Sequence, residues 1–127
     1  MKKNLWQFTL LGSVPSKKNS RQMFSRGGKI ISIPSKSYNL WHEDAKFQLF
    51  NEKIKLQGEL ELDLKFWVQN NRPADLDNKA QSIMDLLQDC EIIENDCWQV
   101  VRKITVECLG IDRKSPRVEI TVKSLET

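Results

Sequence analysis

The clearest structural signal in the chain is the stretch of residues 60–68, which reads Leu60-Glu61-Leu62-Asp63-Leu64-Lys65-Phe66-Trp67-Val68. Apolar residues occupy every second position, and three of the four positions between them are charged. Because successive side chains of a strand point to opposite faces, this alternation predicts a β-strand with one buried face. The run Asn70-Asn71-Arg72-Pro73 follows and predicts the end of the strand.

Helical patterns lie on both sides of this strand in the sequence. Downstream, residues 76–89 carry an apolar stripe formed by Ala80, Ile83, Met84 and Leu87. Upstream, Ser35 is a candidate N-cap for a helix over residues 36–54, whose apolar face comprises Tyr38, Trp41, Ala45 and Leu49. Both stripes predict helices that pack against a sheet.

Four further stretches have the composition of strands, at residues 5–11, 29–33, 99–109 and 117–124. Residues 12–20 are rich in turn formers and are expected to be irregular. The order strand, strand, helix, strand, helix, strand, strand predicts an α/β (α+β) fold. We expect one small mixed sheet with the two main helices packed on one face.

The length and cysteine content set limits on the class of protein. With 127 residues the chain has the size of one domain, and we expect residues 1–127 to form a single domain. The cysteines Cys90, Cys97 and Cys108 are odd in number and lack C-x-x-C spacing, which favours reduced thiols in a cytoplasmic protein over a zinc site. No stretch approaches the ~20 apolar residues of a membrane helix.

Charge is unevenly distributed along the chain, although the formal net charge is only +3. The first 29 residues contain no acid, and their basic residues are Lys2, Lys3, Lys17, Lys18, Arg21, Arg26 and Lys29. Acidic residues dominate from Asp85 to Asp96. This segregation predicts a basic surface that binds phosphates beside an acidic site that binds a metal.

Four aspartates, Asp75, Asp77, Asp85 and Asp96, are candidates for binding a hard divalent cation such as Mg²⁺. On the predicted helix Asp77 and Asp85 share one face but are separated by ~12 Å of rise. Asp75 and Asp77 are therefore the natural pair for one ion, with Asp96 as third ligand and Asp85 in a supporting or second-metal role. Alternatively, Asp77 is a helix N-cap and Asp85 belongs to a solvated face.

Two motifs resemble the RusA-type Holliday junction resolvases (crossover junction endodeoxyribonucleases), which are frequent in prophages. One comprises Asp75-Leu76-Asp77-Asn78, Asp85 eight residues later and Asp96 before Val100-Val101; the other is the early segment Pro15-Ser16-Lys17-Lys18-Asn19-Ser20-Arg21. The resemblance implies a homodimeric, Mg²⁺-dependent endonuclease, with Mn²⁺ as a second candidate ion, that nicks four-way DNA junctions symmetrically in recombination and repair. It also implies that Asp75, Asp77 and Asp96 bind the metal.

The chain departs from this family at two positions. The family usually has a catalytic lysine four residues after the second aspartate of D-x-D, where this chain has Gln81. Lys79 is our candidate for the missing cation, although a shift of two helical residues turns a side chain by ~200°; Lys17, Lys18 or Arg72 are alternatives. The second departure is Asn95, where the family commonly has an aspartate, so a second metal would be held less strongly.

Basic and amide side chains between residues 17 and 26, together with one arginine after the strand at 60–68, are candidates for DNA binding. They are Lys17, Lys18, Asn19, Arg21, Arg26 and Arg72. A solvated basic loop is the alternative reading of the N-terminal group, and we favour phosphate binding because Ser and Asn residues are interleaved with the charges. For Trp98, beside Asp96, we favour packing over insertion into a junction.

Two other functions fit the same sequence. One is a junction-binding DNA protein in which Gln81 impairs cleavage. The other is a metal-dependent nuclease that acts on flaps or replication forks.

Overall fold

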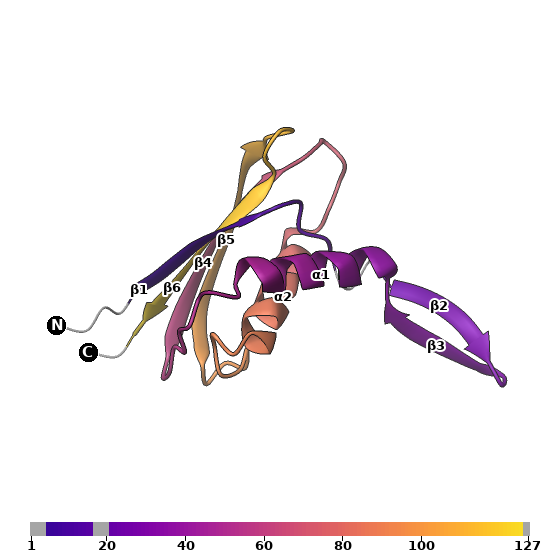
Figure 1. The fold of residues 1–127 in the computed structure, drawn as a ribbon, viewed down its shortest axis with the longest axis horizontal. Coiled ribbons are helices and arrows are strands. Elements are labelled where there is room, and N and C mark those ends of the chain that lie inside the picture. The colour runs from indigo at the N-terminus through magenta and orange to yellow at the C-terminus, as the bar shows by residue number, and fades with distance from the viewer. Residues whose placement is uncertain (1–4, 17–20, 126–127) are drawn as a thin grey trace.

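A computed structural model describes residues 5–16 and 21–125, and for residues 21–26 and 29–34 it describes the backbone alone. The elements follow the order β1 (Leu5–Leu11), β2 (Arg21–Arg26), β3 (Lys29–Pro34), α1 (Lys36–Gln48), β4 (Leu60–Val68), α2 (Leu76–Asp89), β5 (Val101–Ile111) and β6 (Arg117–Ser124). Four of these strands form one sheet in the order β1-β6-β4-β5. Both helices lie on the same side of this sheet (Figure 1).

The strand β4 lies inside the sheet, as its sequence predicts. It pairs antiparallel with β6 and parallel with β5, so the sheet is mixed. Its alternate residues Leu60, Leu62, Leu64 and Phe66 are at most 1% exposed. The α2 residues Ile83, Leu86 and Leu87, all fully buried, belong to the same core. The predicted class, one small mixed sheet with two helices on one face, is confirmed.

The predicted strand at residues 29–33 is present, but its expected place in the main sheet is wrong. As β3 it pairs antiparallel with β2 in a separate two-stranded sheet, which extends beyond the N-terminal end of α1 (Figure 1). The turn between them is Gly27-Gly28, with φ of 59° and 80°. Two consecutive positive φ angles suit glycine and close a two-residue hairpin, so β3 pairs with the strand just before it.

The helix α1 begins as predicted and ends six residues early. The Ser35 hydroxyl accepts a hydrogen bond from the Tyr38 N–H at 3.1 Å, which confirms the N-cap. The helix ends at Gln48, and further along the connection to β4 the Leu56 N–H donates to the Ile92 carbonyl, in the loop after α2, at 2.8 Å. The predicted strand at 99–109 begins and ends two residues later, as β5.

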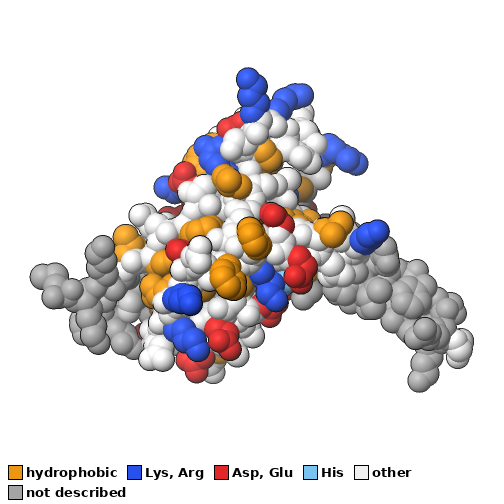
Figure 2. All heavy atoms as spheres, in the orientation of Figure 1, with side chains coloured by type: hydrophobic (Ala, Val, Ile, Leu, Met, Phe, Trp, Pro, Cys, Tyr) orange, Lys and Arg blue, Asp and Glu red, His pale blue; other side chains and the backbone are white. Residues whose placement is uncertain are grey.

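Apolar side chains are scattered among charged ones over α1 (Figure 2). Three large ones on α1 or just after it, Leu40, Phe47 and Phe50, are 62%, 80% and 74% exposed. Within the described residues, no helix has both the length and the apolar character needed to cross a membrane.

Candidate active site around helix α2

Two of the predicted metal ligands flank the first turn of α2. Asp75 occupies the N-cap position, and its Oδ2 accepts a hydrogen bond from the Asn78 side chain at 3.2 Å. Asp77 lies in the first turn, and its Oδ1 accepts from the Asn78 N–H at 3.0 Å. The N-cap position therefore belongs to Asp75, and the alternative that placed Asp77 there is wrong. Both carboxylates are exposed, whereas Asn78 is buried between them.

The structure brings Asp96 to the middle of α2, at Gln81. The Gln81 Nε2 atom lies 3.0 Å from Asp85 Oδ1 and 3.1 Å from Asp96 Oδ2. The loop after α2 makes this possible because Ile92 and Ile93, each 1% exposed, fix it to the core just before Asp96. Asp85 is half-buried and shares a hydrogen-bond donor with Asp96.

The chemistry of these residues suits a hard divalent cation. Carboxylate oxygens are the ligands that Mg²⁺ prefers, and two of them converge on one nitrogen atom of Gln81. Across the described residues, no three Asp, Glu, His or Cys side chains form a group that could hold one ion. The combination of Asp75, Asp77 and Asp96 around a single metal remains a prediction.

Lys79 lies in a different environment from Gln81. Its Nζ donates a hydrogen bond to the Val14 carbonyl, in the segment after β1. Burial lowers the pKa of Lys79, and the nearby Cys108 sulfur on β5 partly offsets that shift. The helix thus directs Lys79 toward Val14 and β5, while Gln81 reaches Asp85 and Asp96, as a ~200° rotation between these positions requires.

A pocket of about 220 Å³ lies beside the N-terminus of α2. It is lined by Ser13, Val68, Gln69, Asn70, Arg72, Pro73, Ala74 and Lys79. Two of these residues are cations, and Asp75 follows Ala74 directly in sequence. The pocket therefore offers positive charge next to a candidate metal ligand.

The segment before the basic run is attached to α2. Val14 is 3% exposed, and the buried Ser82 hydroxyl donates to the Pro15 carbonyl at 2.8 Å. Ser82 was not predicted as a site residue, although a serine on the buried side of a helix indicates a polar partner across the interface. Of the predicted DNA-binding residues, Lys17, Lys18 and Asn19 lie outside the described residues, and Arg21 and Arg26 belong to β2.

Two aromatic residues also lie near this site. Tyr38 of α1 is 4% exposed, and burial together with the neighbouring Asp85 and Asp89 raises its pKa to about 12. Trp98 is 68% exposed, so the prediction that it packs in the interior is wrong. The guanidinium of Arg102 lies 5.6 Å from the centre of the Trp98 ring.

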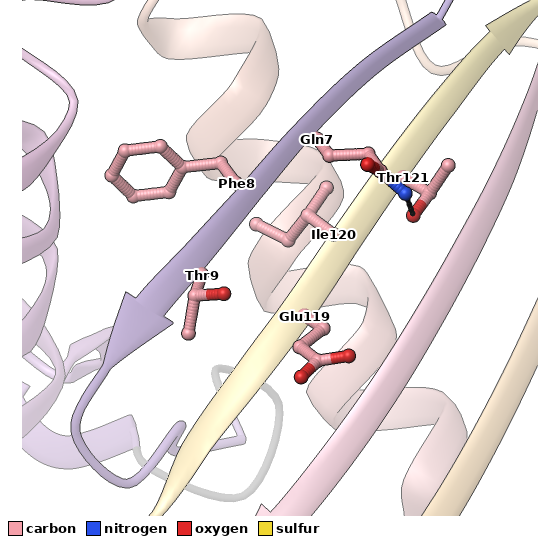
Figure 3. Close-up of a pocket in the computed structure, with 6 residues that line it drawn as sticks. All are labelled: Gln7, Phe8, Thr9, Glu119, Ile120 and Thr121. Atoms are coloured by element: carbon pink, nitrogen blue, oxygen red, sulfur yellow. Dashed lines mark hydrogen bonds between the residues drawn. The ribbon is translucent and has the colours of Figure 1, made fainter.

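A second hollow of about 220 Å³ lies on the sheet between β1 and β6 (Figure 3). Its lining residues are Gln7, Phe8, Thr9, Glu119, Ile120 and Thr121, and Gln7 Nε2 lies 3.5 Å from Thr121 Oγ1. None of the candidate site residues lines it. The candidate residues Asp75, Asp77, Lys79 and Asp85 lie instead on α2 or at its N-cap.

The chain is similar in sequence to known proteins. Residues 14–123 match the family model described as endodeoxyribonuclease RusA. A protein from Aquifex aeolicus (strain VF5), named crossover junction endodeoxyribonuclease RusA, is 28% identical over 89 residues, which are 68% of each chain. The matched range contains the aspartates, Gln81 and the basic segment. The chain belongs to the RusA endodeoxyribonuclease family.

Proposed function

We propose that this protein is a divalent-metal-dependent endodeoxyribonuclease that resolves four-way DNA junctions by paired, symmetric nicks. Membership of the RusA family supports the nuclease class, and the name of the Aquifex aeolicus relative supports the junction substrate. One structural observation supports placing the activity at this site. Asp85 and Asp96 converge at Gln81, one helical turn from Asp77.

The metal in this proposal is Mg²⁺, or Mn²⁺ in its place, held by Asp75, Asp77 and Asp96 with Asp85 in support. A bound divalent ion supplies Lewis acidity toward the attacking water and neutralises charge on the phosphate. The chain itself contributes the fixed carboxylates and the cationic pocket of Arg72 and Lys79.

Lys79 is the proposed catalytic cation. Its ammonium group would donate a hydrogen bond to the scissile phosphate or to the leaving oxygen as negative charge develops there. Partial burial strengthens such a contact because it lowers the local dielectric constant. Two observations support this role: Lys79 lines the pocket beside the N-terminus of α2, and its backbone N–H donates to the Asp75 carbonyl at 3.3 Å.

The basic segment is the proposed DNA-binding surface, with Lys17, Lys18, Asn19, Arg21 and Arg26 contacting phosphates. The hydrogen bond between Ser82 and Pro15 supports this role because it holds the residue before the segment against α2.

A homodimer is also part of the proposal, since a two-fold symmetric junction needs two sites related by a two-fold axis. We place the activity in the cytoplasm, in agreement with three free cysteines.

The first experiment is the substitution Asp77→Asn, assayed on labelled four-way, forked and linear duplex DNA with Mg²⁺ or EDTA. We expect wild-type protein to nick the four-way junction symmetrically in Mg²⁺. Asp77→Asn should lower cleavage at least about 100-fold and leave junction binding equal or tighter, because phosphate contact depends on the basic residues. Glu43→Gln, an exposed change on α1, is the control.

Equal losses of binding and cleavage in Asp77→Asn would contradict the metal assignment. Wild-type cleavage confined to forked substrates would instead identify a fork or flap nuclease. Binding without any product would identify a junction-binding protein with impaired cleavage. The observation behind this last alternative is that the uncharged Gln81 amide bonds both carboxylates at a position where the family usually has a lysine.

A further inference from the structure

The turn between β5 and β6 carries two exposed cations, Arg113 and Lys114. Residues 112–117 contain three basic residues and one acid. The acid, Asp112, lies 2.8 Å from the Arg117 guanidinium, so these two charges offset each other. Neither Arg113 nor Lys114 forms an ion pair with a described residue. The turn therefore presents two uncompensated positive charges to solvent.

Hydrogen bonds within the turn fix its shape. The Asp112 carboxylate accepts from the Ser115 N–H at 3.1 Å and from Arg117, and the same Arg117 nitrogen donates to the Ser115 carbonyl at 2.9 Å. The Arg117 guanidinium also lies 4.1 Å from the centre of the Trp67 ring on β4. Its hydrogen bond lowers the pKa of Asp112, which keeps that carboxylate ionised at neutral pH. The backbone that carries the two cations is thus held in one conformation.

Backbone hydrogen bonds connect the turn to two walls of the pocket beside α2. The Asp112 N–H donates to the Val68 carbonyl at 2.8 Å, and the Gly12 N–H donates to the Pro116 carbonyl at 2.9 Å. Val68 lines the pocket, and so does Ser13, which follows Gly12. The turn therefore lies at the end of the main sheet where β4 ends and the loop to α2 begins (Figure 1).

This attachment limits the distance between the turn and Asp75. A fully extended chain spans at most ~3.6 Å per residue, so the seven steps from Val68 to Asp75 cover at most ~25 Å. One turn of duplex DNA is ~34 Å long. The pocket that Val68 lines contains two more cations, Arg72 and Lys79. A duplex arm cleaved at Asp75 could therefore meet the β5–β6 turn within one helical turn of the cleaved phosphate.

The two ends of the sheet differ in how their cations are paired. Lys and Arg side chains gather at the end that holds the β5–β6 turn, whereas cations and acids are mixed at the opposite end (Figure 2). At that opposite end Lys55 lies 3.4 Å from Glu91, and Arg102 lies 2.6 Å from Glu59. Cations without acidic partners attract phosphates more strongly. The end with the β5–β6 turn is therefore the better surface for DNA.

We propose that the β5–β6 turn is a second DNA-binding element, in which Arg113 and Lys114 contact phosphates of the duplex arm that is cleaved at the α2 site. The choice of DNA as partner rests on the proposed nuclease function. In this arrangement the arm runs from Asp75 across the cationic pocket to the turn. Contacts to phosphates fix the orientation of a duplex without reading its sequence. The turn would thus set the direction in which the cleaved arm leaves the site.

The salt dependence of binding tests this contact. In fluorescence anisotropy in EDTA, Arg113→Ala/Lys114→Ala should bind a four-way junction about tenfold more weakly than wild type, and the slope against the logarithm of salt concentration should fall by about 1.8. Lys53→Ala/Lys55→Ala, at the opposite end of the sheet, is the charge-matched control and should leave the slope within about 0.5 of wild type. An unchanged slope in Arg113→Ala/Lys114→Ala would overturn the proposal.

Photo-cross-linking tests where the arm lies. In the background Cys97→Ser/Cys108→Ser, a benzophenone attached to Lys114→Cys should cross-link in EDTA to the arm that wild type nicks in Mg²⁺, within ~10 bp of the nick. The same reagent at Lys55→Cys should not mark that arm, and the background protein, which retains Cys90, measures any other cross-link. Cross-links spread evenly over all arms, or equal yields from Lys55→Cys, would overturn the proposed path.

These outcomes are separable from the proposed activity. Wild-type cleavage together with an unchanged slope in Arg113→Ala/Lys114→Ala would refute the second DNA-binding element and leave the nuclease proposal intact. A slope reduced by about 1.8 in a protein that cleaves no DNA in Mg²⁺ would support the element and refute the nuclease proposal.

Discussion

The residue that most distinguishes this site is Gln81, whose amide lies between two carboxylates. An amide satisfies them with hydrogen bonds but carries no charge, whereas a lysine there would offset one of their two negative charges and stabilise negative charge on a phosphate. We predict that Gln81→Lys raises the single-turnover cleavage rate about tenfold or more on four-way junctions. Gln81→Met, which keeps the length and removes the donor, is the control and should not raise the rate. An unchanged rate in Gln81→Lys would show that the missing charge is supplied elsewhere.

Substitution of Lys79 should lower cleavage without lowering the stability of the fold. Because burial lowers its pKa, the unfolded chain binds its proton more tightly, and wild-type stability rises with pH between the folded pKa and the unfolded value near 10.5. We predict that Lys79→Met lowers cleavage about 100-fold and unfolds at equal or higher denaturant concentration at pH 7. Its advantage in stability should shrink as the pH approaches 10. Urea titrations at pH 7 and pH 9.5, with the exposed Lys46→Met as control, measure this. A loss of cleavage accompanied by a matching loss of stability at pH 7 would contradict a catalytic role.

At this scale the sequence predicts which residues form the site better than it predicts their contacts. The spacing of Asp75, Asp77 and Asp85 follows from a local helix, so it is available from the sequence. The approach of Asp96 to Asp85 depends on how Ile92 and Ile93 fix the loop to the core, which is a tertiary contact. The exposure of Trp98 likewise depends on where that loop lies.

At the scale of elements, the contact between α1 and α2 includes a titratable side chain, the phenol of Tyr38. Tyr38 on α1 has a pKa of about 12, raised by burial and by Asp85 and Asp89 on α2. The folded state thus holds the phenol proton more tightly than the unfolded state, whose tyrosine titrates near 10. Stability from this group is fully present below pH 10 and is lost between pH 10 and 12.

We predict that Tyr38→Phe flattens this alkaline decline. The wild-type free energy of unfolding should fall by up to about 1.4 kcal/mol per pH unit more steeply than that of the variant above pH 10. Chemical denaturation at pH 9, 10.5 and 11.5 measures the difference, and parallel curves for the two proteins would contradict it. Tyr38 also lies beside Asp85, so a change in cleavage in Tyr38→Phe would report on the position of that carboxylate.

Elements with a regular pattern of apolar residues were predictable, and β2, which lacks one, was not. The bounds of β4 and α2 follow from periods of two and 3.6 residues along the chain. The strand β2 was missed because Arg21-Gln22-Met23-Phe24-Ser25-Arg26 shows no alternation of apolar and polar residues. The turn at Gly27-Gly28 was the available signal, since two glycines between two short extended runs are typical of a hairpin.

At the scale of the whole molecule, charge is divided between a basic N-terminal part and the acidic site on α2. The contacts of Val14 with Lys79 and of Pro15 with Ser82 hold the start of the basic segment against that helix. On the proposed function, a phosphate backbone bound by this segment would lie beside α2, the helix that carries Asp77 and Asp85. The modest net charge of +3 does not reveal this division of charge along the chain.

Salt dependence measures how many phosphates this segment binds. Each phosphate contact releases counterions, so the logarithm of the association constant falls with the logarithm of salt concentration by ~0.9 per contact on duplex DNA. We predict that Lys17→Ala/Lys18→Ala lowers junction affinity and reduces this slope by about 1.8, from two lost contacts. The comparison is made by fluorescence anisotropy in EDTA between 50 and 300 mM salt, which keeps cleavage out of the measurement. Lys53→Ala/Lys55→Ala removes the same charge from the connection between α1 and β4 and should leave the slope within about 0.5 of wild type. Equal slopes for wild type and Lys17→Ala/Lys18→Ala would mean that the segment is a solvated loop, and phosphate binding would then have to be sought at Arg72 and Lys79.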